Sequence, residues 1–333
     1  MTQPNLIGLD VGTSRIVAAR PSSSDFSFQS ELNAFVSVPF SKMTENAMRR
    51  EGISFDVRGE EILVRGNEAP RFADLLNLDT RRPMTLGVLN PTEADGVTVV
   101  RRIVESLTSP RDAESKPGIC YSIPAAPLNG EEGLTYHEAT LRQIFADMDY
   151  DLRSINEGLA VIYSELEDTN YTGIGVSCGG GLCNVAMAYL SMPVMSFSMP
   201  KAGDFIDNSA AAVTGDLASR VRIDKEERFY LNGHFVDKLQ QVLTVYYEDV
   251  INSLITAMRD AFSDSRRMPK LSRPIPIVLS GGTAIPKGFR DRFEKALRTT
   301  DFPIQISEVR MARDPLTATA RGALIAAMTE MSD

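Results

Sequence analysis

The chain has few cysteines and histidines, and those present form no recognisable site. Its 333 residues include three cysteines (Cys120, Cys178 and Cys183) and two histidines (His137 and His234). The cysteines lack metal-ligand spacing, and their odd number without a secretory signal favours reduced thiols in a cytoplasmic protein. The histidines lie far apart in the sequence, so neither is expected to be catalytic.

Excess positive charge and long apolar runs are also absent. The formal net charge is -9, which disfavours binding to nucleic acid or to an anionic membrane surface. No stretch of about 18 apolar residues occurs, so no transmembrane helix is expected. Residues 1–5 are too short and too polar for a signal peptide or an amphipathic membrane helix, so no direct membrane insertion is expected. With 43% hydrophobic residues, the chain can bury a large core, and its length favours two domains.

Three glycine-bearing segments are the most informative feature of the sequence. They cover residues 8–14 (GLDVGTS), 177–183 (SCGGGLC) and 279–286 (LSGGTAIP), and each follows an apolar run typical of a strand. Glycine permits close approach of the backbone to a ligand. Because the first two segments lie about half the chain apart, we expect two similar half-domains with nucleotide phosphates between them.

The first turn combines a carboxylate with donors. Backbone N–H groups around Gly12 would form an anion site, and Thr13 and Ser14 add hydroxyls. Asp10 beside such a site needs a cation, and Mg²⁺ is usually held by one or two carboxylates, phosphate oxygens and water. An ordinary hairpin turn explains this segment equally well when it is taken alone.

The second and third turns are less specific. The second has three consecutive glycines, which cost backbone entropy and favour close ligand approach: Gly179, Gly180 and Gly181. The third, with Gly281, Gly282 and Thr283, could approach an adenine and ribose. A glycine-rich β-turn and an ordinary strand-to-helix loop are the respective alternatives.

Hydrophobic periodicity predicts a mixed α/β fold. The first glycine turn leads into a second strand, unlike a Rossmann unit, where it opens a helix. Residues 21–30 are expected to form a polar loop. Strands are expected over 6–10, 16–19, 34–40, 53–64 (a hairpin), 119–124, 185–190, 194–199, 275–279 and 304–306, and helices over 93–107, 138–148, 156–166, 207–222, 237–261, 289–297 and 315–328.

Together, the three turns resemble the motifs of the actin, DnaK-chaperone and sugar-kinase ATPase superfamily. Residues 155–160 (INEGLA) resemble its first connecting helix. Within it, bacterial actin-like proteins of the MreB and MamK type are most similar, on length and on residues 82–89 and 314–324. The resemblance implies two ribonuclease-H-like domains with inserted small subdomains around a central nucleotide cleft. The implied boundaries are 1–30, 76–156 and 321–333 (first large subdomain), 31–75 (first small), 157–203 and 257–320 (second large), and 204–256 (second small, mainly helical).

The resemblance also implies roles for single residues. Asp10 would hold Mg²⁺ at the phosphates of ATP or ADP, and Glu157 would position the attacking water, so both are candidate catalytic residues. Further nucleotide contacts are implied for Gly203, Arg222, Lys225 and Ile285. For Glu157 the alternative is an exposed helix charge, and for Arg222 and Lys225 it is a solvated helix face.

Three positions depart from the superfamily pattern. Ser177 stands where relatives carry an acidic residue, and Leu182 and Cys183 stand where they tend to carry threonine. Leucine has no donor and cysteine only a weak one. We therefore expect nucleotide binding with slowed hydrolysis.

Three functions are consistent with these residues. The first is a cytoplasmic actin-like ATP-binding protein that polymerises head to tail with itself and engages a cargo or adaptor protein that the sequence does not identify. The second is a non-polymerising, chaperone-like ATPase or nucleotide-dependent scaffold. The third, a small-molecule kinase, is less favoured because no carboxylate base is evident near the second or third turn.

Overall fold

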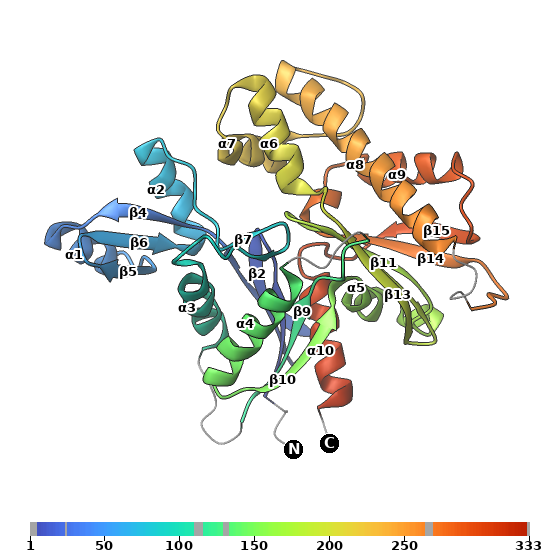
Figure 1. Ribbon diagram of the computed structural model, residues 1–333, viewed down its shortest axis with the longest axis horizontal. Coiled ribbons are helices and arrows are strands. Elements are labelled where there is room, and N and C mark those ends of the chain that lie inside the picture. Colours follow the sequence, from blue (N-terminus) through green and yellow to red (C-terminus); the bar gives the residue numbers. More distant parts are fainter. Residues whose placement is uncertain (1–4, 24, 110–115, 129–132, 264–268, 332–333) are drawn as a thin grey trace.

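The computed structural model describes residues 5–23, 25–109, 116–128, 133–263 and 269–331. The interpretation of residues 1–5 as too short for a membrane helix falls almost wholly on residues 1–4, which lie outside these ranges. Two five-stranded sheets form the centres of two halves, shown in Figure 1.

The two sheets have the same topology. The first has the strand order β10-β9-β1-β2-β3 and the second β13-β12-β11-β14-β15. In each, the first strand pairs antiparallel with the next strand along the chain and parallel with a later one. The strands are β1 (Leu6–Val11), β2 (Arg15–Pro21), β3 (Phe26–Leu32), β9 (Gly118–Ile123) and β10 (Asp151–Asn156), then β11 (Gly173–Cys178), β12 (Cys183–Tyr189), β13 (Met192–Met199), β14 (Ile275–Ser280) and β15 (Ile306–Met311).

Helices lie around and between the sheets, as Figure 1 shows. The expected two-half α/β architecture is therefore confirmed. Helices α3 (Gly96–Thr108) and α4 (Leu134–Asp147) belong to the first half, α5 (Glu157–Glu165) and α10 (Ala318–Glu330) lie centrally, and the second half has α6 (Gly203–Thr214), α7 (Ala218–Arg228), α8 (Lys238–Phe262) and α9 (Phe289–Arg298).

An insertion follows β3. It has a three-stranded sheet of order β4-β6-β5 with its own apolar core. A two-stranded hairpin leads from it to α3. The elements are β4 (Phe35–Pro39), α1 (Lys42–Arg50), β5 (Phe55–Arg58), β6 (Glu61–Arg65), α2 (Ala69–Leu76), and the hairpin strands β7 (Met84–Thr85) and β8 (Val88–Leu89).

Three local expectations were wrong. The strand expected over 304–306 is β15, which begins only at Ile306 and ends at Met311. Residues 21–30 are largely strand, because β3 is an edge strand whose polar side chains face outward. The helix expected over 207–222 is two helices, α6 and α7. Helix α6 ends at Gly215, whose φ of 83° is the left-handed conformation that glycine favours at helix ends.

Glycines let the central helices pack without intervening side chains. A Cβ on Gly322 of α10 would lie 1.8 Å from the Ala160 carbonyl oxygen of α5. A Cβ on Gly158 of α5 would lie 2.6 Å from the Ala186 nitrogen of β12. Helix α5 is thereby held in backbone contact with both α10 and the second sheet, which fixes Glu157 at its first position.

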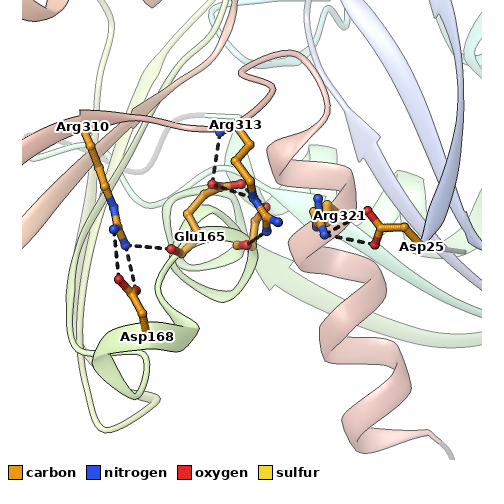
Figure 2. Close-up of polar contacts among 7 residues, drawn as sticks. Asp25, Glu165, Asp168, Arg310, Arg313 and Arg321 are labelled. Carbon is orange, nitrogen blue, oxygen red and sulfur yellow. Dashed lines mark hydrogen bonds and ion pairs between the residues drawn. The ribbon is translucent and has the colours of Figure 1, made fainter.

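Ion pairs connect α5 and α10 to neighbouring segments, mainly near the C-terminal end of α5 (Figure 2). Arginines on β15, in the segment between β15 and α10, and on α10 itself bind carboxylates from α5, the turn that follows it and the β2–β3 turn. The pairs are Arg310 with Asp168 (2.9 Å), Arg313 with Glu165 (3.4 Å) and Arg321 with Asp25 (3.1 Å). Together they connect both halves to the two central helices.

Candidate functional site

A cavity of about 500 Å³ lies between the two halves. All three glycine turns line it, and so does every residue for which the sequence suggests a role. The structure therefore brings together residues that span most of the chain. They are Asp10, Gly12, Thr13, Ser14, Glu157, Gly179, Gly180, Gly181, Gly203, Arg222, Lys225, Gly281, Gly282, Thr283 and Ile285.

The first two turns are equivalent hairpin turns. The Gly12 N–H donates to the Arg15 carbonyl oxygen over 2.9 Å, and the Gly179 N–H donates to the Leu182 carbonyl oxygen over 2.9 Å. Each turn joins the first two strands of its sheet. The internal repeat is thus a repeat of backbone geometry at the cavity.

The two turns also touch each other. A Cβ on Gly180 would lie 2.2 Å from Ser14 Oγ, and one on Gly181 would lie 2.6 Å from Thr13 Oγ1. A Cβ on Gly181 would also lie 2.3 Å from the backbone nitrogen of Gly87, in the β7–β8 hairpin. These glycines are therefore required for contact between the halves, in addition to any approach to a ligand.

The third turn is fixed on the second. Gly281 has a φ of 89°, and a Cβ there would lie 2.2 Å from the Cys178 carbonyl oxygen. The Thr283 hydroxyl donates to the Gly179 carbonyl oxygen over 2.7 Å. The two turns of the second half consequently form one rigid wall of the cavity.

Asp10 and Glu157 form a pair of carboxyl groups at one end of the cavity. Burial raises the pKa of Asp10 to about 6, although the Ser122 hydroxyl donates to its Oδ1 over 2.7 Å and opposes the shift. Burial and then the charge of Asp10 raise the pKa of Glu157 to about 8. Hydrogen bonds from Ser177 and Asn184 oppose this second shift. At neutral pH, this pair therefore tends to retain one proton.

This donor set suits a hard cation. Two buried carboxyl groups whose pKa values are raised would be stabilised in their ionised form by a nearby positive charge. Among the residues that the structure describes, no group of three or more acidic, histidine or cysteine side chains could hold a metal ion. The protein would thus supply Asp10, with phosphate oxygens and water completing an Mg²⁺ shell, which is the usual protein arrangement for Mg²⁺.

The other end of the cavity is lined by α6, α7 and aromatic rings. Lys225 Nζ forms a buried ion pair with Asp207 Oδ1 at 2.6 Å. Burial raises the pKa of Asp207 to about 6, and Lys225 opposes that shift. Phe229 and Tyr247 stack with their centroids 4.9 Å apart. A pocket that combines aromatic rings with a small number of fixed polar groups suits a planar heterocycle.

Polar contacts also cross between the halves beside the cavity. Four of them join α6 or α7 to the first half. They are Arg82 with Asp204 (3.0 Å), Arg220 with Asp74 (3.1 Å), the Ser219 hydroxyl with Asp79 (2.5 Å), and the longer pair Arg15 with Glu226 (4.0 Å). The described conformation is thus one in which the two halves touch across the cavity.

Sequence reasoning did not identify several residues of the site. Asn184 and Ser122 bind the two carboxylates directly, while Arg82 links Ser14 to Asp204. Asn184 carried a usable signal, because a polar side chain interrupts an otherwise apolar strand. The partners of Ser122 and Arg82 are distant in sequence, and no local pattern indicates them.

Comparisons with known proteins agree with this architecture. The chain is similar to a structure titled as a MamK double helical filament, with a TM-score of 0.69, 19% identity, and coverage of 97% of this chain and 98% of that chain. A non-polymerising MamK mutant bound to AMPPNP has a TM-score of 0.58 at 19% identity, with the same coverage. The ethanolamine utilization protein EutJ from Carboxydothermus hydrogenoformans has a TM-score of 0.56 at 14% identity, with 98% and 91% covered. No curated protein matches the chain.

The comparison with protein families is more specific. Residues 6–327 match the Volactin family. The chain belongs to the Volactin family. The actin-like ATPase fold that the glycine turns predict for this Volactin-family protein is confirmed. Within the described ranges, no helix has the length and apolar character needed to span a membrane.

The three residues that depart from the pattern described in the sequence analysis, Ser177, Leu182 and Cys183, do not all lie at the cavity. Ser177 and Leu182 line the cavity. Leu182 packs against Gly87, where a Cβ would lie 2.2 Å from Leu182 Cδ1. Cys183 is buried outside the cavity lining, and its thiol donates to the Lys201 carbonyl oxygen over 3.3 Å. The departures that bear on the cavity are thus at Ser177 and Leu182.

Proposed function

We propose that this Volactin-family protein is an actin-like ATP-binding cytoskeletal protein that polymerises head to tail into filaments. The observation that carries the proposal is the meeting of two equivalent glycine turns at a cavity that also holds two carboxyl groups. The similarity to a MamK filament supports the polymerisation. Heterologous contacts that do not close into a ring generate such filaments.

In this proposal, the phosphates lie between the first two turns and the base lies beside α7. Backbone N–H groups and the hydroxyls of Thr13 and Ser14 would bind the phosphates. Asp10 would hold Mg²⁺, whose positive charge would offset the phosphate charge. Gly203 would face the phosphates, and Arg222, Lys225 and Ile285 would contact the nucleoside, with the charge of Lys225 paired with that of Asp207.

Hydrolysis would be slow. Glu157 would orient the attacking water, since phosphoryl transfer depends mainly on positioning and charge stabilisation. Neutral Ser177 donates to Glu157 over 3.3 Å, so this position supplies no second carboxylate for the metal and water.

The relative positions of the four subdomains would depend on the bound nucleotide. We propose the boundaries given by the resemblance, with residues 31–75 and 204–256 as the two small subdomains. Nucleotide would shift the equilibrium toward the closed arrangement that the cross-cavity contacts describe, and closure would set the geometry of the filament contact.

Sedimentation with ATP, ADP and no nucleotide tests this function, with electron microscopy of the pellets. The proposal expects filaments with ATP and less pelleted protein without nucleotide. Nucleotide binding by a protein that stays monomeric in all three conditions would instead favour the chaperone-like ATPase or scaffold.

A further inference from the structure

Asn184 lies on β12 of the second half with its side chain fully buried. It forms two hydrogen bonds that point in different directions. Its Nδ2 donates to Glu157 Oε2 over 2.9 Å, and its Oδ1 accepts from the Ala125 N–H over 2.8 Å. Ala125 follows β9 and therefore belongs to the first half. One amide thus links Glu157 to the opposite half of the molecule.

The orientation of this amide is determined by its partners. The backbone N–H of Ala125 can only donate, so it must face the amide oxygen of Asn184. The amide nitrogen is then left facing Glu157. The bond to Ala125 is buried and the bond to Glu157 is partly buried, so removing one partner leaves the other unsatisfied at a cost in stability.

The backbone around Ala125 is joined to the second half at a further point. The Ser198 N–H donates to the Ala126 carbonyl oxygen over 3.0 Å, and the Leu128 N–H donates to the Ser198 carbonyl oxygen over 3.4 Å. Ser198 is the partner of Asn184 in the β12–β13 register. Residues 125–128, which we call the docking segment, therefore pair with β13 directly beside Asn184.

We propose that Asn184 is a positioning residue that fixes Glu157 Oε2 when the docking segment of the first half lies against β13. A shift of the docking segment away from the second half would remove the partner that orients the amide. The Glu157 carboxyl group would then lose its fixed direction. A change in the relative position of the two halves would thus alter the orientation of the Glu157 carboxyl group through the side chain of Asn184. The functional part rests on the proposed function, because it assumes that Glu157 acts on the bound nucleotide.

Three variants test the proposal: Asn184→Asp, Glu157→Gln and the double variant. Asn184→Asp keeps the shape and an acceptor for Ala125 but presents an oxygen to Glu157. It should lower the ATP hydrolysis rate by about tenfold, the equivalent of one hydrogen bond to a charged group, with a smaller change in nucleotide affinity. Asn208→Asp, on the exposed face of α6, adds the same charge and serves as the control.

The double variant separates positioning from a general loss of packing. Introducing an amide at position 157 restores a donor and acceptor pair with the new carboxylate at position 184. The melting temperature without nucleotide should therefore recover most of the loss caused by Asn184→Asp, while hydrolysis should stay low because position 157 lacks its carboxylate.

The two readouts are independent. Additive melting-temperature losses in the double variant would overturn the proposal, and so would hydrolysis by Asn184→Asp at the rate of the unmodified protein. If the unmodified protein binds no nucleotide, the proposed function fails, but the melting-temperature cycle still decides whether Asn184 orients Glu157.

Discussion

Ser14 and Gly180 bring the two halves of the molecule into direct contact. A Cβ on Gly180 would lie 2.2 Å from Ser14 Oγ, so no other residue fits at position 180 without a shift. Arg82 donates to the same hydroxyl over 3.1 Å and pairs with Asp204 of the second half. The end of the cavity that we propose binds the phosphates is thus formed jointly by both halves and depends on their contact.

Replacing Gly180 by alanine should displace the Ser14 hydroxyl and so disturb the contact between the first two turns, because a Cβ there would lie 2.2 Å from Ser14 Oγ. We expect the affinity for ATP to fall by about tenfold or more, because both turns must donate to the same phosphates. Calorimetric titration measures this. Gly282→Ala is the steric control for folding, since a Cβ there meets nothing closer than 3.6 Å, and its melting temperature should change little. Unchanged ATP affinity in Gly180→Ala would show that the phosphates do not lie between these turns.

Ser177→Asp would introduce the acidic residue that the resemblance to the actin superfamily implies at this position. The new carboxylate would lie beside Glu157, so the nucleotide-free protein should melt at a lower temperature because a third acidic group is buried there. Mg²⁺ with ATP should reverse that loss, and hydrolysis should become faster. Turnover equal to that of the unmodified protein would contradict the assignment of Ser177 as the cause of slow hydrolysis.

The stability of the nucleotide-free protein should fall as pH rises from about 4.5 to 8. The pKa of Glu157 is raised from 4.5 to about 8, so the folded state binds more protons than the unfolded state in this window. The contribution of Glu157 to the free energy of unfolding is present below pH 4.5 and is lost as pH rises through 8. Between these values the free energy of unfolding falls with a limiting slope of about 1.4 kcal/mol per pH unit.

Denaturant unfolding at several pH values measures that slope. Glu157→Gln should reduce it above pH 6, while Asp10 and Asp207, whose pKa values are also raised, should keep some slope at lower pH. Because Mg²⁺ favours ionised carboxylates, the affinity for Mg²⁺ with ATP should rise over the same pH range. An equal slope in Glu157→Gln would mean that Glu157 is ionised in the folded protein at neutral pH.

The contacts between α7 and the first half should control release of nucleotide. Asp79→Ala removes the acceptor for both the hydroxyl and the N–H of Ser219. Because this contact is exposed, we expect a loss of about 1 kcal/mol at most and a nucleotide release rate up to about fivefold faster. Stopped-flow release of a fluorescent ATP analogue measures the rate.

The exposed pair of Arg220 and Asp74 offers a matched test. Asp74→Arg alone should speed release by repulsion, and the exchange of both charges in Asp74→Arg/Arg220→Asp should restore it. Equal release rates in all these variants would mean that closure does not depend on α7.

Local sequence patterns revealed the parts of the site that are made of turns. The order of the glycine segments and their strand flanks predicted the two halves, and all the residues suggested for the site line one cavity. The edge strand β3 was missed because its side chains are polar, and the break at Gly215 was missed because the apolar spacing continues across it.

Contacts that depend on the packing of distant segments could not be predicted. Asn184 meets Ala125, and Arg82 meets Asp204, only because the two sheets face each other. The glycines of the second turn were interpreted as positions that allow a ligand to approach the backbone. In the structure they also permit contact with Ser14 and Gly87. A single sequence gives no direct information on such pairs.

All three candidate functions require that the cavity between the halves binds a nucleotide with Mg²⁺. Calorimetric titration of the full chain with AMPPNP, in the presence and absence of Mg²⁺, tests it most directly. The account predicts one nucleotide per chain, with affinity that falls when Mg²⁺ is removed or when Asp10 is replaced by asparagine. No binding to the unmodified chain, or binding that neither Mg²⁺ nor Asp10→Asn affects, would contradict it.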